Sequence, residues 1–167
     1  MDDLVIRQCK KEDLPLLEKY IPTARYHINR FESQEKGDCL YLIAWVEGVP
    51  VGHLNLKLKG TDEEYVRNSL GVFPEFNAIG TYPPEMRSKG VGRALIEKAE
   101  KVCKELGFKE IGLAVDTENT RAELLYRRMG FNDSGVGEFD SVWWDTKEDG
   151  AQEKNVDHCI YLVKKIR

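Results

Sequence analysis

The chain has 167 residues, of which 41% are hydrophobic and 32% are charged, and its formal net charge at pH 7 is −4. This length and composition predict one folded domain spanning residues 1–167, with a core of ordinary size. No apolar run reaches the length of a membrane-spanning helix, and the first residues lack the pattern of a signal peptide. We therefore expect a cytoplasmic protein with no membrane partner.

The first half of the chain predicts three strands and two helices. In chain order these are a strand at residues 4–6, a helix opened by residues 11–13, a helix from Thr23 to about Glu35, and strands at residues 40–46 and 51–58. Thr23 is expected to cap its helix, and residues 47–50 carry the signal of a hairpin turn. Residues 60–71 are polar and acidic and are expected to form an excursion, with no helix or strand assigned to it.

The second half predicts further strands that alternate with helices. In chain order these are a strand at residues 73–82, a helix from Val91 closed by Gly107, a strand at residues 111–115, a helix at residues 119–129, and strands at residues 139–144 and 158–163 separated by a polar loop. The order predicts an α/β (α+β) domain. Its mixed sheet should be mostly antiparallel around one βαβ unit, with helices on both faces.

Charge and cysteine content limit the partners. Residues 87–109 hold seven Lys/Arg against three Glu, whereas residues 132–158 hold eight Asp/Glu against two Lys. This layout suits a polyanionic cofactor on one side and a cationic acceptor on the other, although two solvated faces explain it equally well. Nucleic acid is not expected as a partner. The four scattered cysteines fit neither a zinc site nor a redox dithiol, so we expect free thiols and no metal, with a structural disulfide as the alternative.

The most informative segment is Arg87-Ser88-Lys89-Gly90-Val91-Gly92, at the junction of a predicted strand and helix. Its glycines allow a tight turn with uncovered N–H groups, and the start of the helix adds further unpaired N–H groups that attract anions. The cationic side chains beside it, including Arg93, favour the same ligand. Its spacing fits neither a P-loop nor a Rossmann turn. A turn that merely permits strand–helix packing remains an alternative.

A second motif begins 27 residues after Gly92, with Asn119, Ala122 and Tyr126 on one face of the next helix. The small Ala122 leaves room for a thin ligand, and Tyr126 offers a phenol. Asn119 as a plain helix cap and Tyr126 as a core aromatic stay open.

Together the two motifs resemble the GCN5-related N-acetyltransferase (GNAT) superfamily, most strongly over residues 73–131. The resemblance implies that acetyl-CoA is the co-substrate and that residues 87–92, with Arg93, bind its pyrophosphate. It also implies that the main-chain N–H of Tyr82 polarises the acetyl carbonyl. Asn119 would contact the pantetheine or the start of the helix, and Tyr126 would lie near the thioester sulfur.

The expected reaction is direct transfer of the acetyl group to a primary amine of a small molecule or peptide in a ternary complex. Tyr126 is the candidate donor of a proton to the departing thiolate. The general base stays open, because residues 78–80 carry no carboxylate. Glu75 is the candidate, with a solvated surface carboxylate as its alternative. His53 could relay a proton, but a plain strand-surface histidine is the favoured interpretation.

The sequence also predicts the side from which the acceptor approaches, and it leaves an alternative function open. The acceptor is expected to approach from the side built by residues 23–36, 60–71 and 133–157. There Trp143 and Trp144 should face opposite ways, one in the core and one toward the acceptor. The alternative function is a non-catalytic, acyl-CoA-binding regulatory module. The amine, the acyl length and a homodimeric assembly are not decided by the sequence.

Overall fold

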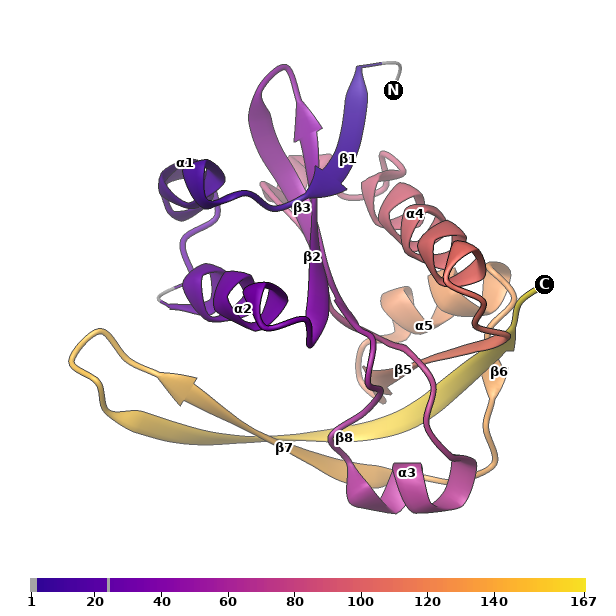
Figure 1. The fold of residues 1–167 in the computed structure, drawn as a ribbon. Helices are drawn as coiled ribbons and strands as arrows, with labels where there is room; N and C mark the ends of the chain where they lie inside the picture. Colours follow the sequence, from indigo (N-terminus) through magenta and orange to yellow (C-terminus); the bar gives the residue numbers. More distant parts are fainter. Residues whose placement is uncertain (1–2, 24) are drawn as a thin grey trace.

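The computed structural model describes residues 3–23 and 25–167, and a mixed β-sheet lies at its centre (Figure 1). The strands are β1 (Leu4–Gln8), β2 (Cys39–Val46), β3 (Val49–Lys57), β4 (Glu75–Thr81), β5 (Glu110–Asp116), β6 (Asn132–Asp133), β7 (Phe139–Thr146) and β8 (Gln152–Lys165). Their order is β1-β2-β3-β4-β5-β8-β6, with β7 paired to β8. The pair β4–β5 is parallel and the other described pairs are antiparallel. The expected mixed sheet is confirmed.

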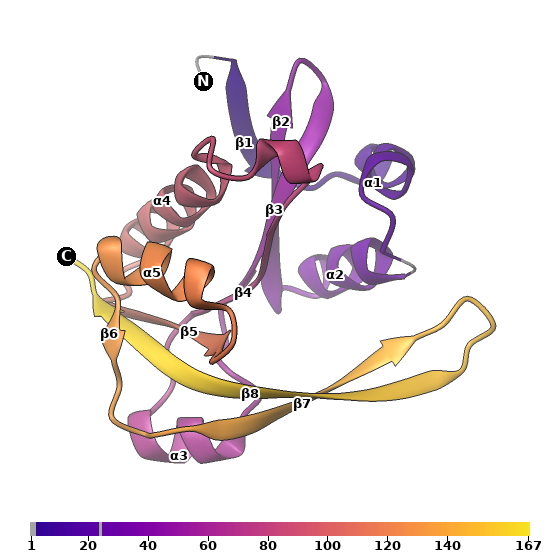
Figure 2. The ribbon, with the colours of Figure 1, turned by 180° about the vertical axis from the view of Figure 1, so that it is seen from behind.

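Helices cover both faces of this sheet (Figures 1 and 2). They are α1 (Leu14–Tyr20), α2 (Tyr26–Glu35), α3 (Glu64–Leu70), α4 (Val91–Glu105) and α5 (Thr120–Arg128). On one face, α4 connects β4 to β5 and buries Leu95 and Ile96 against Leu54 and Phe76. On the other face, α2 packs over β2, and α1 packs over β2 and β3. Burial of apolar side chains on both faces holds the sheet in place.

A bulge in β4 separates it from β5. His53 of β3 pairs with Gly80, whereas Asn55 pairs with Asn77, so Ala78 and Ile79 together stand opposite the single residue between them. Ala78 has a φ of 51°, in the left-handed region that alanine seldom adopts. Bulges bend the strand that contains them. Accordingly, β4 pairs with β5 at Glu75 and Gly112 alone, and the two strands diverge beyond that point.

Two local expectations in the first half are wrong. The residue that precedes α2 is Arg25, and no side chain caps this helix. Thr23 offers its main-chain oxygen to the N–H of Tyr26 instead, at 3.2 Å. The excursion at residues 60–71 contains the helix α3, because Val66 is buried in a small cluster with Phe73 and Tyr161. Burial against distant residues outweighs the polar composition of this segment.

The polar loop expected between the last two strands is largely strand. β7 and β8 pair continuously from Phe139–Cys159 to Thr146–Gln152. The two strands form a two-stranded ribbon, the β7–β8 ribbon, which extends beyond the sheet below α2 (Figure 1). Trp143 and Trp144 alternate in direction as expected, but they are 39% and 57% exposed, so neither lies in the core. Much of the ribbon is exposed to water, so its sequence is polar. A polar composition does not predict a strand, and the sequence therefore indicated a loop.

Further features of the described residues concern membrane-spanning helices, disulfides and metal-binding groups. None of the described helices is both long and apolar enough to cross a membrane. Cys9, Cys39, Cys103 and Cys159 are all buried and free. Within residues 3–23 and 25–167, no group of three or more His, Cys, Asp or Glu side chains is placed to hold a metal ion.

Candidate active site

A cleft of about 590 Å³ lies between the end of β4, the start of α4 and the face of α5. Nine of the residues expected to bind the cofactor line it, namely Arg87, Ser88, Gly90, Val91, Gly92, Arg93, Asn119, Ala122 and Tyr126. Lys89 and Tyr82, although expected there, are not among the lining residues. The two motifs, separated in sequence, thus meet across one cavity.

The turn before α4 presents its backbone to the cleft. Ser88 and Gly90 have φ values of 65° and 87°, both left-handed, and Gly90 is the residue that precedes the helix. Left-handed residues in a tight turn bring successive N–H groups to one concave side, which favours anions. A Cβ at Gly90 would meet no atom within 4 Å, and one at Gly92 would meet only Leu125, at 3.8 Å. Close packing against the protein therefore does not explain these glycines.

Arginine side chains surround the same end of the cleft. Arg87, Arg93, Arg121 and Arg128 line it, and Arg121 donates to the hydroxyl of Ser88. Among these, Arg93 is paired with Glu97 at 2.8 Å on the exposed side of α4. Arg121 and Arg128 were not singled out in the sequence, since their place depends on how α5 packs beside α4. The cleft wall has a clear excess of positive charge.

The other end of the cleft is formed by Ile79, Gly80 and Thr81, after the bulge in β4. The N–H of Tyr82 donates to the oxygen of Val51 at 2.9 Å, so it is not free to polarise an acetyl carbonyl. This corrects the role expected for Tyr82. Because backbone groups alternate in direction along a strand, the N–H of Thr81 points away from β3, toward the side where β5 diverges.

The α5 residues combine structural and cleft-lining positions. Oδ1 of Asn119 accepts the N–H of Ala122 at 3.3 Å, so Asn119 is indeed the cap of α5 while it also lines the cleft. Tyr126 is 8% exposed, and its ring packs against Phe131 with centroids 6.3 Å apart. Burial raises the pKa of Tyr126 to about 12, so its phenol stays protonated at neutral pH.

Glu75 lies elsewhere. It is 4% exposed at the start of β4, which excludes the surface interpretation, and it is not among the residues that line the cleft. Its carboxyl group accepts hydrogen bonds from the hydroxyl of Tyr161 at 3.1 Å and from the side-chain amide of Asn77 at 3.4 Å. Burial raises its pKa. The structure therefore does not bring Glu75 to Tyr126.

Residues 6–131 match the model of the acetyltransferase (GNAT) family. The chain belongs to this family. Among curated relatives, it is 29% identical over 99 residues to spermidine N(1)-acetyltransferase of Thermoplasma acidophilum, a match that covers 59% of this chain and 54% of that protein. In two further matches the chain spans 29% and 40% of the relative's length.

Solved GNAT structures have the same fold. The ribosomal-protein-S18-alanine N-acetyltransferase of Escherichia coli superposes with a TM-score of 0.67 at 19% identity, over 98% of this chain and 94% of that one. The PaiA N-acetyltransferase of Thermoplasma acidophilum, solved in complex with coenzyme A, gives 0.65 at 19% identity, over 98% and 99% of the chains.

Proposed function

We propose that this GNAT protein transfers an acetyl group from acetyl-CoA to a primary amine, by direct attack in a ternary complex. One observation carries the proposal. A single cleft connects an anion-binding turn with arginines at one end to the divergence of β4 and β5 at the other. This shape suits a long ligand that has phosphates at one end and a thioester at the other.

The phosphate end would be held chiefly by the main chain. N–H groups at Ser88–Gly92 and the start of α4 would bind the pyrophosphate, and Arg87, Arg93 and Arg121 would add charge. A cradle of this kind needs no particular side chain at the glycines, only open space above them. The open space at Gly90 and Gly92 supports this assignment.

The chemistry follows from the groups at the other end. The amine nitrogen forms a bond to the acyl carbon, and the carbon–sulfur bond breaks. The N–H of Thr81 would donate to the acyl oxygen as negative charge develops there. The hydroxyl of Tyr126 would give its proton to the departing sulfur, and the buried phenol is protonated at neutral pH. The scheme uses no metal ion.

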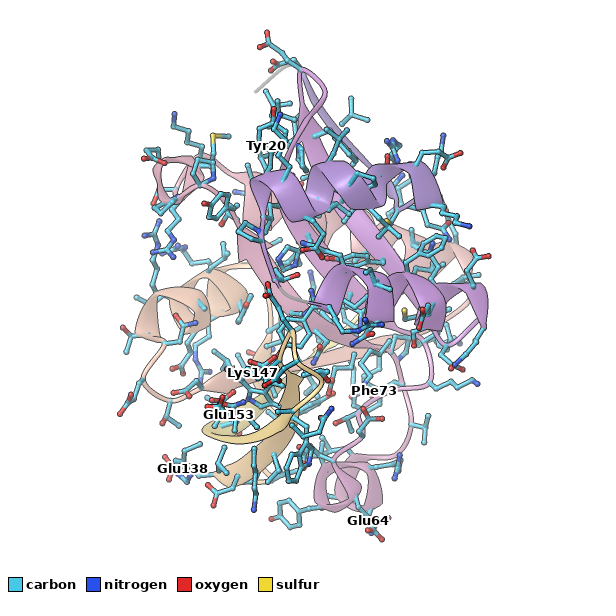
Figure 3. All side chains as sticks on the ribbon, turned by 90° about the vertical axis from the view of Figure 1, so that its left-hand side faces the viewer. Tyr20, Glu64, Phe73, Glu138, Lys147 and Glu153 are labelled. Atoms are coloured by element: carbon cyan, nitrogen blue, oxygen red, sulfur yellow. The ribbon has the colours of Figure 1, made fainter. Side chains whose placement is uncertain are left out.

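The acceptor would be cationic before it loses its proton. On the β7–β8 ribbon, Trp143 and Asp145 share the face toward α2, where the rings of Trp143 and Tyr26 lie 6.4 Å apart. Figure 3 looks onto α1 and α2 and shows Lys147 and Glu153 at the end of the ribbon below them. Acidic and aromatic side chains attract ammonium groups. The first acceptors to test are therefore polyamines and peptide amines. Spermidine, a polyamine, appears in the name of one relative.

The decisive experiment measures release of the CoA thiol from acetyl-CoA in the presence of spermidine, amino-acid amides and N-terminal peptides. Thiol release that depends on one of these amines, together with mass-spectrometric detection of the acetylated product, supports the transferase. Hydrolysis of acetyl-CoA without an acetylated amine contradicts it.

A regulatory module that binds acyl-CoA without turnover is the second candidate. The observation that favours it is the cleft wall, in which no described lining residue carries a carboxylate. Such a module binds CoA in calorimetry yet releases no thiol with any amine of the panel. The two measurements together separate the candidates.

A further inference from the structure

His53 lies on the face of the sheet opposite α4. Its neighbour Gly52 faces α4, because a Cβ there would come within 2.9 Å of Val91. Side chains alternate along a strand, so His53 points to the other face. This is the face that α2 and the ribbon border, from which the acceptor is proposed to approach.

The imidazole of His53 is fixed by the bulge of β4. Nδ1 lies 2.7 Å from the main-chain oxygen of Ala78. A carbonyl oxygen only accepts hydrogen bonds, so Nδ1 carries the hydrogen and donates it. In a neutral ring, Nε2 then holds the lone pair. The bulge therefore selects the tautomer as well as the orientation of the ring.

The same ring covers the strand segment that forms the inner end of the cleft. A Cβ at Gly80 would lie 3.0 Å from both Cε1 and Nε2 of His53. Gly80 itself lines the cleft, beside Thr81. Nε2 thus stands on the acceptor side of the segment where β4 has diverged from β5. No described residue forms a hydrogen bond with Nε2.

The surroundings keep this nitrogen unprotonated. The ring centroid of His53 lies 6.0 Å from that of His27 and 6.1 Å from that of Tyr41. Burial, and then the positive charge of Arg30, lower the pKa of His53 to about 3. The lone pair is therefore free at neutral pH.

We propose that Nε2 of His53 accepts the proton of the attacking amine. This inference rests on the proposed acetyl transfer and supplies the base which that scheme lacks. The bound ammonium first loses one proton to solvent; as the resulting amine nitrogen bonds to the acyl carbon and the carbon–sulfur bond breaks, a second proton passes from nitrogen to Nε2, while the sulfur leaves with the proton of Tyr126. His53 then releases its proton to solvent, and Tyr126 regains one. An ammonium nitrogen bonded to the reacting carbon is far more acidic than a free one, which lowers the basicity that Nε2 needs.

The arrangement follows the logic of an oriented base, in which a third group fixes the imidazole that takes the proton. Here the third group is the oxygen of Ala78. This makes a purely structural role testable. Asparagine at position 53 has a side-chain N–H that can still bond to Ala78, but it has no basic nitrogen.

The test compares wild type, His53→Asn and His53→Ala, with an amine that the wild type acetylates. We expect kcat to fall about 100-fold or more in both variants, the usual range for loss of a general base. The Kd for CoA, measured by calorimetry, should stay within about twofold and also report that the variants are folded. Added imidazole should restore part of kcat in His53→Ala alone. His158→Ala, at an exposed position on the ribbon, is the matched control.

Three outcomes overturn the inference. Near wild-type kcat in His53→Asn means that the ring only holds the bulge. A deficit in His53→Ala that imidazole does not restore likewise excludes a chemical role. If the wild type binds CoA but acetylates no amine, the proposed function fails and the inference with it. Wild-type turnover together with active variants refutes only the role of His53.

Discussion

Tyr126 contributes to the core and to the cleft with one side chain. Its ring packs against Phe131, and the residue lines the cavity opposite the end of β4. Its seven-residue spacing from Asn119 predicted that the two side chains share one face of the helix, because helical periodicity is a local property of the sequence. The pairing of the Tyr82 N–H with Val51 was not predictable in the same way. It depends on the register of β3 and on a bulge that no local pattern marks.

The first prediction concerns the phenol of Tyr126. Tyr126→Phe keeps the ring but removes the proton donor, so we expect kcat to fall about 100-fold, as for loss of a general acid. The Kd for CoA and the thermal midpoint should change little, since burial alone, with no hydrogen bond to a described residue, accounts for the raised pKa of the phenol. Steady-state kinetics and calorimetry check both. Unchanged kcat would mean that Tyr126 serves packing alone.

The second prediction concerns Glu75, whose pKa is raised by burial. Because the folded state holds this proton more tightly than the unfolded state, stability is lost as the pH rises through the window above the unfolded pKa. Glu75→Gln removes that loss. We expect the variant to gain stability over wild type at pH 8 in urea unfolding, with the gain vanishing below pH 4.

The same variant decides whether Glu75 is the base. Since Glu75 does not line the cleft, Glu75→Gln should keep kcat within about threefold of wild type, well short of the loss expected for a general base. A loss of kcat comparable with that of Tyr126→Phe would return Glu75 to the reaction and contradict the assignment to His53.

At the level of elements, the β4–α4–β5 unit was predictable and its neighbours were less so. The apolar spacing of α4 and the glycines at both its ends are local signals, and they lie in one continuous segment. The helix α3 and the ribbon β7–β8 lack such signals. Their stability comes from contacts with residues far along the chain, such as Val66 with Tyr161. Local propensity and composition do not predict contacts between residues that lie far apart in the sequence.

The third prediction tests the start of α4. Gly92→Glu places bulk and a negative charge beside the proposed pyrophosphate site, so we expect the Kd for CoA to rise more than tenfold, about 1.4 kcal/mol or more. Gly92→Ala adds only a Cβ that would meet Leu125 at 3.8 Å, so it controls for folding and should weaken binding less. Equal affinities in wild type and Gly92→Glu would refute the cradle.

Over the whole molecule, basic side chains surround the proposed cofactor site and acidic side chains surround the proposed acceptor site. Basic residues line the cleft on the α4–α5 side, and acidic residues are concentrated in the β7–β8 ribbon. This ribbon lies below α2 (Figure 1). The sequence showed this asymmetry but not its use, because solvated faces would have the same composition. The alternation along β7 decides which acids face α2. Asp145 lies on the side of Trp143, and Asp140 lies on the opposite side.

The fourth prediction follows from that difference. Asp145→Asn removes a charge that faces α2, near the ring of Tyr26, whose pKa is raised to about 12 by burial and then by Asp145. We expect KM for a cationic amine to rise several-fold at low salt, with the difference shrinking as salt screens the field over about 10 Å at 0.1 M. Asp140→Asn removes the same charge from the outer face and should leave KM unchanged. Equal effects of the two variants would assign the acidic ribbon to general solubility instead of acceptor binding.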